Sequence, residues 1–391
     1  MTMCFVEKFK QVLWIKLLLF IILGIQSSCN VKNLYNDFNS FKEIDRSDDV
    51  IRLYFDREGF LYPKYSIPKT DFYNSYSRLF DVFQQKEFAK SMFESEGLTY
   101  ETTGSDTVDF ETLQDAIIER SVNKINQLSE NRKLLFLIHG YNNTAVEAKS
   151  SYEYAQQIIK KKYPDESFQV VEVYWDGLHN DGSSLNSWII WNNAQAQASW
   201  CGLGLRRIMN QINQDTTYVL THSHGAAVIT ETLFNVRRFK DRYYKGEGRE
   251  IAVRQAIYDT PKTNFRVAML VPAIPGKNVF DEYFDRTVDG LFVRQTNDKN
   301  YLFINGFNKY DKVVNKFIFY KRFGSTTLGC RETEHKDVLT LFNDDKNIYR
   351  RVKFSDQADY KDKREHGFKY YMDNPKFNDL LDQLFTAQYE K

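Results

Sequence analysis

The sequence has little cysteine, no excess of charge of either sign, and no repeats or low-complexity tracts. Its cysteines are Cys4, Cys29, Cys201 and Cys330, and they form neither a CxxC pair nor a Cys/His pattern with metal-ligand spacing, which argues against a structural zinc site. Lys and Arg total 53 and Asp and Glu total 52, without a long basic block, so composition gives no reason to expect a nucleic acid partner. Hydrophobic residues make up 42% of the chain, enough for a globular protein.

The first 29 residues differ from the rest of the chain. Lys8 and Lys10 open this segment, an apolar stretch (VLWIKLLLFIILGI) follows, and small residues lead to Cys29 in the phrase QSSC. A positive start, a short apolar stretch and small residues before a cleavage point are typical of an export signal, and the run after Lys16 is too short to span a bilayer. Residues 1–29 are therefore predicted to be a signal peptide.

The end of this segment resembles a bacterial lipoprotein signal, although GIQSSC lacks the usual leucine and the alanine or glycine before the cysteine. The resemblance implies that the thiol of Cys29 is acylated and that Cys29 becomes the new N-terminus. We therefore expect an exported, membrane-anchored protein of the periplasm or the cell surface. The alternative is an uncleaved N-terminal membrane anchor, which leaves the domain on the same side. Export would permit a disulfide between Cys201 and Cys330 without requiring one.

Residues 30–104 follow as a polar, aromatic and irregular extension. They contain one strand-like run (VIRLYFD, 50–56) and one helical stretch (YSRLFDVFQQKEFAKSMF, 76–93). We expect this extension to be a cover or an edge element.

An α/β pattern begins in residues 105–391. An amphipathic helix is predicted over 109–128, and short apolar runs then alternate with helical segments. The runs are LLFLI (134–138), FQVVEVYW (168–175), TYVLT (217–221), FRVAMLV (265–271) and YLFING (301–306). This alternation predicts an α/β fold with a mostly parallel central sheet and helices on both faces. Two charged insertions, 238–263 and 319–362, are expected to be surface excursions.

Ser223 stands where the third of these runs meets an alanine-rich helix. Ligands of open parallel sheets bind beyond the carboxyl ends of the strands, and the phrase YVLTHSHGAAVIT reads as strand, sharp turn and helix, with Ser223 at the apex and Gly225 two residues later. This phrase resembles the nucleophile elbow of the α/β-hydrolases, usually GxSxG. Thr221 replaces the first glycine, which is a departure from the pattern.

The resemblance to α/β-hydrolases of largely unassigned substrate extends over about residues 130–390, and the first hundred of these match best. In such enzymes an HG loop after the first strand supplies part of the oxyanion hole. Here His139 and Gly140 match that loop, so the backbone amides of Tyr141 and His224 would hold the oxyanion. The side chain of His139 need not be catalytic, because a loop histidine is commonly structural.

The resemblance also implies an acid and a base, in the chain order serine, acid, histidine. Asp311 lies a few residues past the last strong strand, where the family keeps its aspartate; a solvated turn aspartate is the alternative. His366 precedes a closing helix that Asn374 and Pro375 can start. His335 is the other downstream histidine, and it is expected to be solvated in a charged insertion.

Two further patterns have open interpretations. His222 and His224 are alternate residues near a strand end and could suggest a metal site, but no third ligand stands nearby, so no metal is expected. Trp188, Trp191 and Trp200 could roof the pocket or simply fill the core beneath it.

The sequence thus predicts a serine hydrolase that cleaves a carboxylic ester or related acyl compound through an acyl-enzyme on Ser223, with His366 as general base and acid and Asp311 as its orienting partner. No cofactor is expected. The expected partners are a small or lipid-like acyl substrate and, through the anchor, a membrane. The rival is a binding lipoprotein that kept the hydrolase fold and lost the chemistry, since fold alone does not guarantee function.

Overall fold

The structure is a computed structural model. It describes residues 31–32, 34, 50–63, 78–180, 184–234, 246–255, 263–280, 301–315, 325–356 and 365–386. The predicted signal peptide, Cys29 and the side chain of Trp188 lie outside the described residues.

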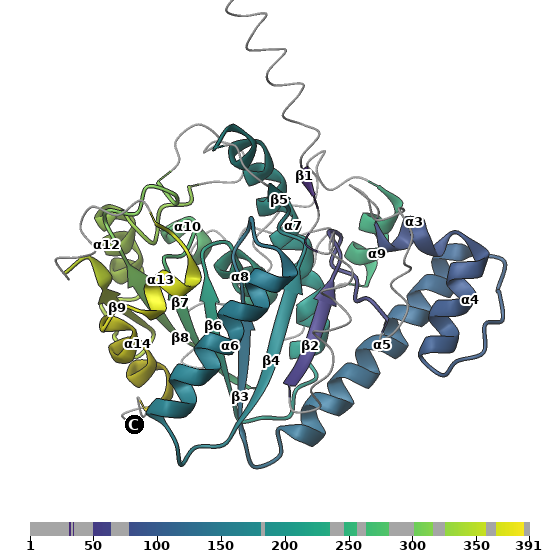
Figure 1. The fold of residues 1–391 in the computed structure, drawn as a ribbon, viewed down its shortest axis with the longest axis horizontal. Helices are drawn as coiled ribbons and strands as arrows, with labels where there is room; N and C mark the ends of the chain where they lie inside the picture. The colour runs from purple at the N-terminus through teal and green to yellow at the C-terminus, as the bar shows by residue number, and fades with distance from the viewer. Residues whose placement is uncertain are drawn as a thin grey trace, which may run out of the picture.

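A seven-stranded sheet forms the centre of the described part of the chain (Figure 1), and all of its neighbouring strands are parallel. Its strands, in spatial order, are β2 (Val50–Phe55), β4 (Phe168–Trp175), β3 (Lys133–Ile138), β6 (Thr216–His222), β7 (Asn264–Leu270), β8 (Tyr301–Phe307) and β9 (Tyr349–Lys353). The five predicted apolar runs are strands β3, β4, β6, β7 and β8, with ends that agree within one residue. The predicted α/β fold is therefore confirmed.

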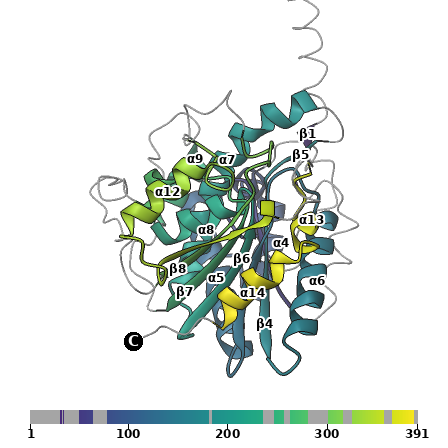
Figure 2. The same ribbon diagram turned by 90° about the vertical axis from the view of Figure 1, so that its left-hand side faces the viewer.

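Helices cover both faces of the sheet, as Figure 2 shows edge-on. One face carries α6 (Ala145–Lys162), α13 (Phe368–Met372) and α14 (Lys376–Phe385). The other carries α7 (Ser184–Met209), α8 (Gly225–Phe234), α9 (Glu247–Arg254) and α12 (Glu332–Leu341). The remaining helices are α3 (Leu79–Phe83), α4 (Lys86–Ser95), α5 (Asp106–Leu128) and α10 (Lys277–Phe280). None of the helices within the described ranges is long and apolar enough to cross a membrane.

Local sequence explains where the helices next to the site begin. Thr144 and Glu147 form a reciprocal capping box at the start of α6, which satisfies backbone N–H groups that a helix end leaves unpaired. In α14 the Asn374 side chain accepts a hydrogen bond from Lys376 N–H at 2.9 Å, as the sequence predicted. The buried side of α14 is its apolar stripe of Phe377, Leu380, Leu381, Leu384 and Phe385.

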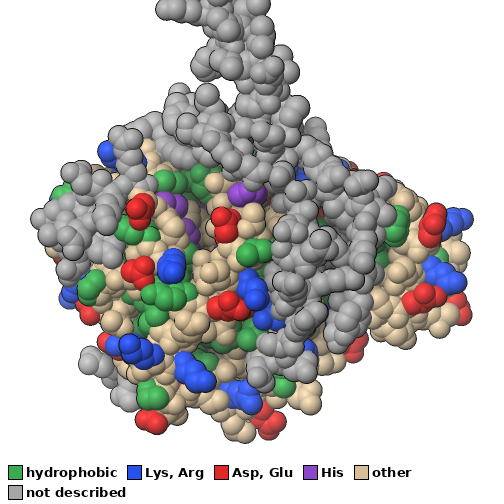
Figure 3. All heavy atoms as spheres, in the orientation of Figure 1, with side chains coloured by type: hydrophobic (Ala, Val, Ile, Leu, Met, Phe, Trp, Pro, Cys, Tyr) green, Lys and Arg blue, Asp and Glu red, His purple; other side chains and the backbone are tan. Residues whose placement is uncertain are grey.

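The face that carries α6 and α14 is turned to the viewer in Figure 3, and it shows acidic and basic side chains scattered among apolar and polar ones. Among the described residues visible on it, no large area of one sign of charge stands out. This mixture agrees with the nearly equal numbers of acidic and basic residues in the sequence.

Part of the N-terminal extension is built into the sheet. Its strand-like run is β2, the edge strand beside β4, and Arg52 of β2 makes a buried ion pair with Glu172 of β4 at 2.9 Å. Asp56 follows the strand and accepts the Leu79 N–H at the start of α3 at 2.9 Å. These contacts tie residues 50–63 and α3 to the rest of the molecule.

The expectation that residues 319–362 form a surface excursion is wrong for the described part of that segment. Residues 325–356 contain α12 and β9, and β9 is the second edge strand of the sheet. Tyr349 and Val352 of β9 are buried, whereas Arg350 and Arg351 are half-buried. A short edge strand with two arginines lacks the continuous apolar run by which the other strands were found. Within the insertion at 238–263, α9 packs against α7.

Candidate active site

The HG loop and Ser223 follow two strands, β3 and β6, at the point where the strand order reverses. From β3 the chain passes through α6 on one face to β4, then crosses back over β3 to reach β6 on the other side. In an open parallel sheet, ligands bind outside the carboxyl ends of the strands at such a switch point. The residues after β3 begin with His139, and Ser223 comes directly after β6.

Ser223 occupies a strained turn between β6 and α8. Its φ angle is 53°, a left-handed conformation that costs a residue other than glycine about 1–3 kcal/mol and persists only where the surroundings enforce it. Here the Ser223 N–H donates to the Leu270 carbonyl at 3.0 Å, and the Ser223 carbonyl accepts from the N–H groups of Ala226 and Ala273, both at 3.1 Å. The strained turn is therefore fixed from both the neighbouring strand and the following helix.

Gly225 allows the elbow to pack against β3. A Cβ atom there would lie 2.3 Å from Thr221 Oγ1, 2.7 Å from the His139 carbonyl oxygen and 2.8 Å from the Ile138 carbonyl oxygen. Thr221 is thus accommodated because Gly225 leaves space beside it, which explains how the elbow tolerates threonine in place of the usual first glycine. A Cβ on Gly140 would similarly lie 3.0 Å from Ser223 Cβ, so the HG loop also lies against the serine.

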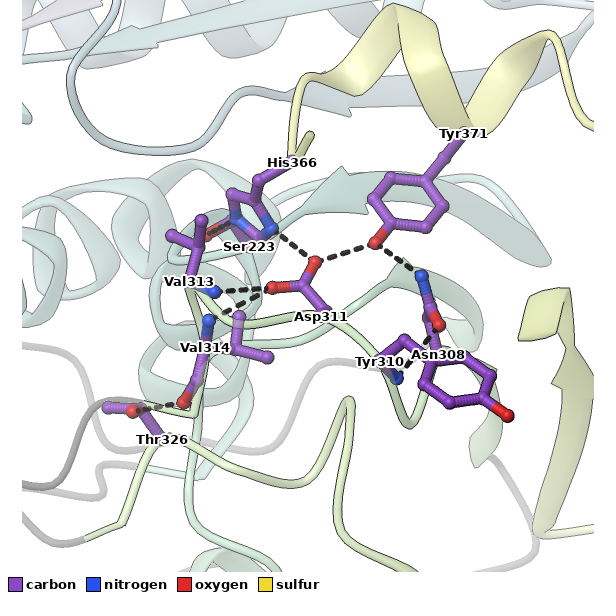
Figure 4. A network of polar contacts seen from close by, with 9 residues as sticks. All are labelled: Ser223, Asn308, Tyr310, Asp311, Val313, Val314, Thr326, His366 and Tyr371. Carbon is purple, nitrogen blue, oxygen red and sulfur yellow. Dashed lines mark hydrogen bonds and ion pairs between the residues drawn. The ribbon is translucent and has the colours of Figure 1, made fainter. Parts of the chain in front are cut away.

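Ser223, His366 and Asp311 form a continuous hydrogen-bonded chain (Figure 4). His366 Nε2 lies 2.8 Å from Ser223 Oγ, and His366 Nδ1 lies 2.6 Å from Asp311 Oδ2. Since ionised Asp311 can only accept, Nδ1 carries the hydrogen and Nε2 is left to accept the serine proton. This is the arrangement of nucleophile, base and orienting acid expected of an activated serine.

Asp311 is buried, and its surroundings favour the ionised form. Burial alone would raise the pKa of this carboxyl, but the charge of His366 and hydrogen bonds from His366, Tyr371 and the Val314 N–H lower the pKa below its ordinary value. Its Oδ1 accepts from Val313 N–H at 2.8 Å and from Val314 N–H at 3.1 Å. Asp311 is therefore not the solvated turn residue that the sequence left open.

Tyr371 is a member of this network that the sequence did not predict. Its hydroxyl donates to Asp311 Oδ2 at 2.6 Å and accepts from Asn308 Nδ2 at 3.1 Å (Figure 4). Asn308 in turn accepts the Tyr310 N–H at 3.1 Å, which holds the turn that precedes the aspartate. Tyr371 lies on α13 beside Tyr370, and no feature of the sequence separates the two tyrosines.

The chain matches no protein-family model and no curated protein sequence.

His139 shapes the loop after β3. Its Nε2 accepts the Trp175 N–H at 3.2 Å, which assigns the hydrogen to Nδ1, 2.6 Å from the Gly140 carbonyl. Its ring stacks on Trp175, with centroids 5.6 Å apart, and burial lowers the pKa of His139 to about 4. A neutral, fully bonded imidazole in this place supports the backbone, in line with the structural role considered for it.

Tyr141 and His224, whose amides were predicted to form the oxyanion hole, come from opposite loops and pack together. Their ring centroids lie 5.4 Å apart, and both rings contact Trp191 of α7, at 4.6 Å for Tyr141 and 4.2 Å for His224. All three side chains are buried. Trp191 thus belongs to the wall beside the site, whereas Trp200 is fully buried farther along α7.

His222 packs against the other side of the site. Its ring lies 4.7 Å from the His366 ring and stacks on Phe368 at 5.3 Å, and burial lowers its pKa well below the ordinary value. The rings of His222 and His224 therefore contact different neighbours instead of converging on one point. Within the described ranges, no group of three His, Cys, Asp or Glu side chains could hold a metal ion.

His335 and the cysteines complete the predicted residues. The expectation that His335 is solvated is wrong: its side chain is buried on α12, with Nδ1 3.1 Å from Tyr349 Oη. The charged residues around His335 gave no indication that α12 packs this side chain against β9. Of the two downstream histidines, His366 is the one hydrogen-bonded to Ser223.

Cys201 and Cys330 are both buried free thiols, so the disulfide that export would permit is not formed.

Proposed function

We propose that this protein is a serine hydrolase that cleaves a carboxylic ester or a related acyl compound. The observation that carries the proposal is the pair of hydrogen bonds joining Ser223 Oγ, His366 and Asp311. The three residues come from separate loops after β6 and β8 and before α13, so no local backbone geometry requires them to meet. The meeting of these three residues, with Ser223 on a strained turn, is best explained by a need for a reactive hydroxyl.

Each group has a defined part in the reaction. Ser223 Oγ attacks the carbonyl carbon as His366 Nε2 takes its proton, and the tetrahedral oxyanion is held by the backbone N–H groups of Tyr141 and His224. When the intermediate collapses, His366 returns the proton to the leaving alcohol and an acyl-enzyme remains. Water, deprotonated by the same imidazole, then releases the acid and regenerates Ser223.

Asp311 stabilises the imidazolium that forms in each step. Because its pKa is lowered below the ordinary value, it stays ionised through the neutral range and can balance the positive charge on His366. Helix α8 begins two residues after the serine, at Gly225, and its helix dipole favours the negative charge that develops there.

We also propose that the chain is exported and held on a bacterial membrane by acylation of Cys29. The support is in the sequence, where a charged start, a short apolar stretch and small residues end at this cysteine.

The test of the enzyme proposal is labelling with a fluorophosphonate probe, which reacts rapidly with an activated serine. The folded parent protein, starting at Asn30, should be labelled. Ser223→Ala and His366→Ala should each lower labelling and ester hydrolysis by about 1,000-fold or more, because members of such a triad act as a unit. His335→Gln is the matched control, since it removes a buried histidine away from Ser223, and it should keep its labelling. A folded parent that is not labelled would refute the proposal and favour the binding lipoprotein.

A further inference from the structure

The chain enters the domain at the edge of the sheet that carries the candidate site. Strand β1 (Val31–Lys32) pairs antiparallel with β5 (His179–Asn180), Val31 opposite Asn180 and Lys32 opposite His179. β5 follows the carboxyl end of β4 by three residues. Both ribbon views show β1 and β5 at the end of the sheet where the parallel strands finish (Figures 1 and 2).

Leu34 fixes this entry point next to the HG loop. Its N–H donates to Asp176 Oδ1 at 3.0 Å, and its carbonyl accepts the Ala145 N–H at the start of α6 at 3.2 Å. Leu34 is itself buried. Asp176 precedes Gly177, where a Cβ would lie 3.0 Å from Tyr141 Cα. A short series of direct contacts therefore links the entry point to the loop that borders Ser223.

The distance from this point to the membrane anchor is short. Cys29 is two residues before Val31 and five before Leu34, and an extended chain spans at most about 3.5 Å per residue. The two-residue separation therefore limits the distance between Val31 and the cysteine that we propose to be acylated to about 7 Å. The same limit applies if the apolar segment is not cleaved, because that segment also ends just before β1. Either anchor brings the bilayer surface to this edge of the sheet.

We propose that the protein lies on the membrane with the carboxyl edge of its sheet, and hence Ser223, facing the bilayer, and that its substrate is an acyl ester of a lipid in that membrane. The orientation rests on the proposed membrane anchor, and the substrate claim rests in addition on the proposed hydrolase function. A lipid ester bond lies at the boundary between headgroups and acyl chains, so an enzyme that faces this boundary meets its substrate at high local concentration.

Surface features agree with an orientation set by the tether. The face visible in Figure 3 mixes both signs of charge, so it offers no strong attraction that would turn the molecule onto that side. Val146 is 47% exposed, one of two large hydrophobic side chains found exposed among the described residues. It follows Ala145, the residue that binds Leu34, and so it lies on the edge that would face the lipid.

The orientation can be measured with a pair of cysteines on one helix. Val146→Cys and Lys161→Cys place exposed thiols at opposite ends of α6, 15 residues and therefore about 22 Å apart. The native Cys201 and Cys330 are buried and should react little with a thiol-specific dye. The full chain, acylated in cells and reconstituted in vesicles that contain a lipid with a nitroxide headgroup, should show at least twofold stronger quenching at position 146 than at 161. Equal quenching, or stronger quenching at 161, would overturn the orientation.

A longer tether tests the substrate claim. Twenty Gly and Ser residues inserted between Asn30 and Val31 span roughly 25 Å on average, enough to let the domain turn. This variant should hydrolyse a fluorogenic phospholipid in vesicles about tenfold more slowly than the parent. Its rate of hydrolysis of soluble p-nitrophenyl butyrate should be unchanged. Equal phospholipid rates in both proteins would overturn the claim that the short tether presents Ser223 to the bilayer. Cleavage of the soluble ester without any cleavage of the phospholipid would overturn the lipid substrate. Failure of the hydrolase proposal itself differs, because then even the soluble ester stays intact while the quenching asymmetry remains.

Discussion

Asp311 Oδ2 receives hydrogen bonds from two side chains, His366 and Tyr371. The Tyr371 bond contributes to keeping the pKa of Asp311 low. Tyr371→Phe should therefore raise that pKa, so that the aspartate becomes protonated at a higher pH and no longer balances the imidazolium. We expect kcat to fall about tenfold, equivalent to about 1.4 kcal/mol, with little change in KM. The acidic limb of the pH–rate profile should move to higher pH.

Tyr310→Phe is the matched control for this variant. Tyr310 takes part in the same turn through its backbone N–H, which the substitution retains. Its kcat and pH profile should equal those of the parent. If Tyr371→Phe lowered kcat by the same factor at every pH, Tyr371 would have a packing role only.

His335 gives a pH dependence of stability that is separate from catalysis. Burial, followed by the charge of Arg351, lowers its pKa from 6.5 to about 4. Between these values the unfolded chain binds a proton that the folded chain does not, so this histidine costs stability as pH falls through that window. The full effect is about 3 kcal/mol, from about 1.4 kcal/mol for each pH unit.

His335→Gln removes this titration. The free energy of unfolding of the parent, minus that of His335→Gln, should therefore decrease by up to about 3 kcal/mol between pH 7 and pH 4. Urea unfolding at a series of pH values gives this difference directly, and the contributions of other titrating groups cancel in it. A difference that stays constant with pH would show that the buried ring is accessible to protons in the folded state.

The elbow between β6 and α8 requires a residue without a side chain at position 225. Gly225→Ala would bring its Cβ within 3 Å of two backbone carbonyl oxygens and of Thr221 Oγ1, and the backbone oxygens cannot rotate away. We expect a loss of at least about 2 kcal/mol in the free energy of unfolding, together with loss of fluorophosphonate labelling because Ser223 is displaced.

Gly367→Ala is the control for this substitution. A Cβ at Gly367 would have nothing within 4 Å, and its φ of −60° suits alanine. It should unfold at the same urea concentration as the parent and keep its labelling, although it adjoins His366. Equal behaviour of the two alanine variants would contradict the close packing at the elbow.

Among the helices and strands, those predicted from the sequence are the ones whose own residues give a strong local signal. Five strands with continuous apolar runs were predicted, and so was α14, whose cap and apolar stripe are both local. β9 was missed because its five residues include two arginines and a lysine, and only pairing with β8 makes it a strand. Tyr371 was missed for a related reason: its partner Asp311 is 60 residues away, and such a contact has no local signature.

In the molecule as a whole, strand β2 makes part of the N-terminal extension integral to the folded sheet. Ile51, Leu53 and Phe55 of β2 are at most 3% exposed, and burying three such side chains contributes roughly 5–9 kcal/mol. A domain of ordinary stability has only about 5–15 kcal/mol in total. Without β2, Glu172 would also lose Arg52, its buried ion-pair partner, and an unpaired buried charge costs several kcal/mol.

A chain that begins at Ser105 should therefore fail to fold, whereas one that begins at Asn30 should fold. We expect the shorter chain to show no cooperative thermal transition by circular dichroism and to elute as aggregates in size-exclusion chromatography. The single substitution Arg52→Met separates the two causes, because it leaves β2 in place and removes only the charge that pairs with Glu172. It should lower the free energy of unfolding by about 3–5 kcal/mol. A chain from Ser105 that unfolds cooperatively at the same temperature as the longer one would mean that β2 is an attachment to an already complete sheet.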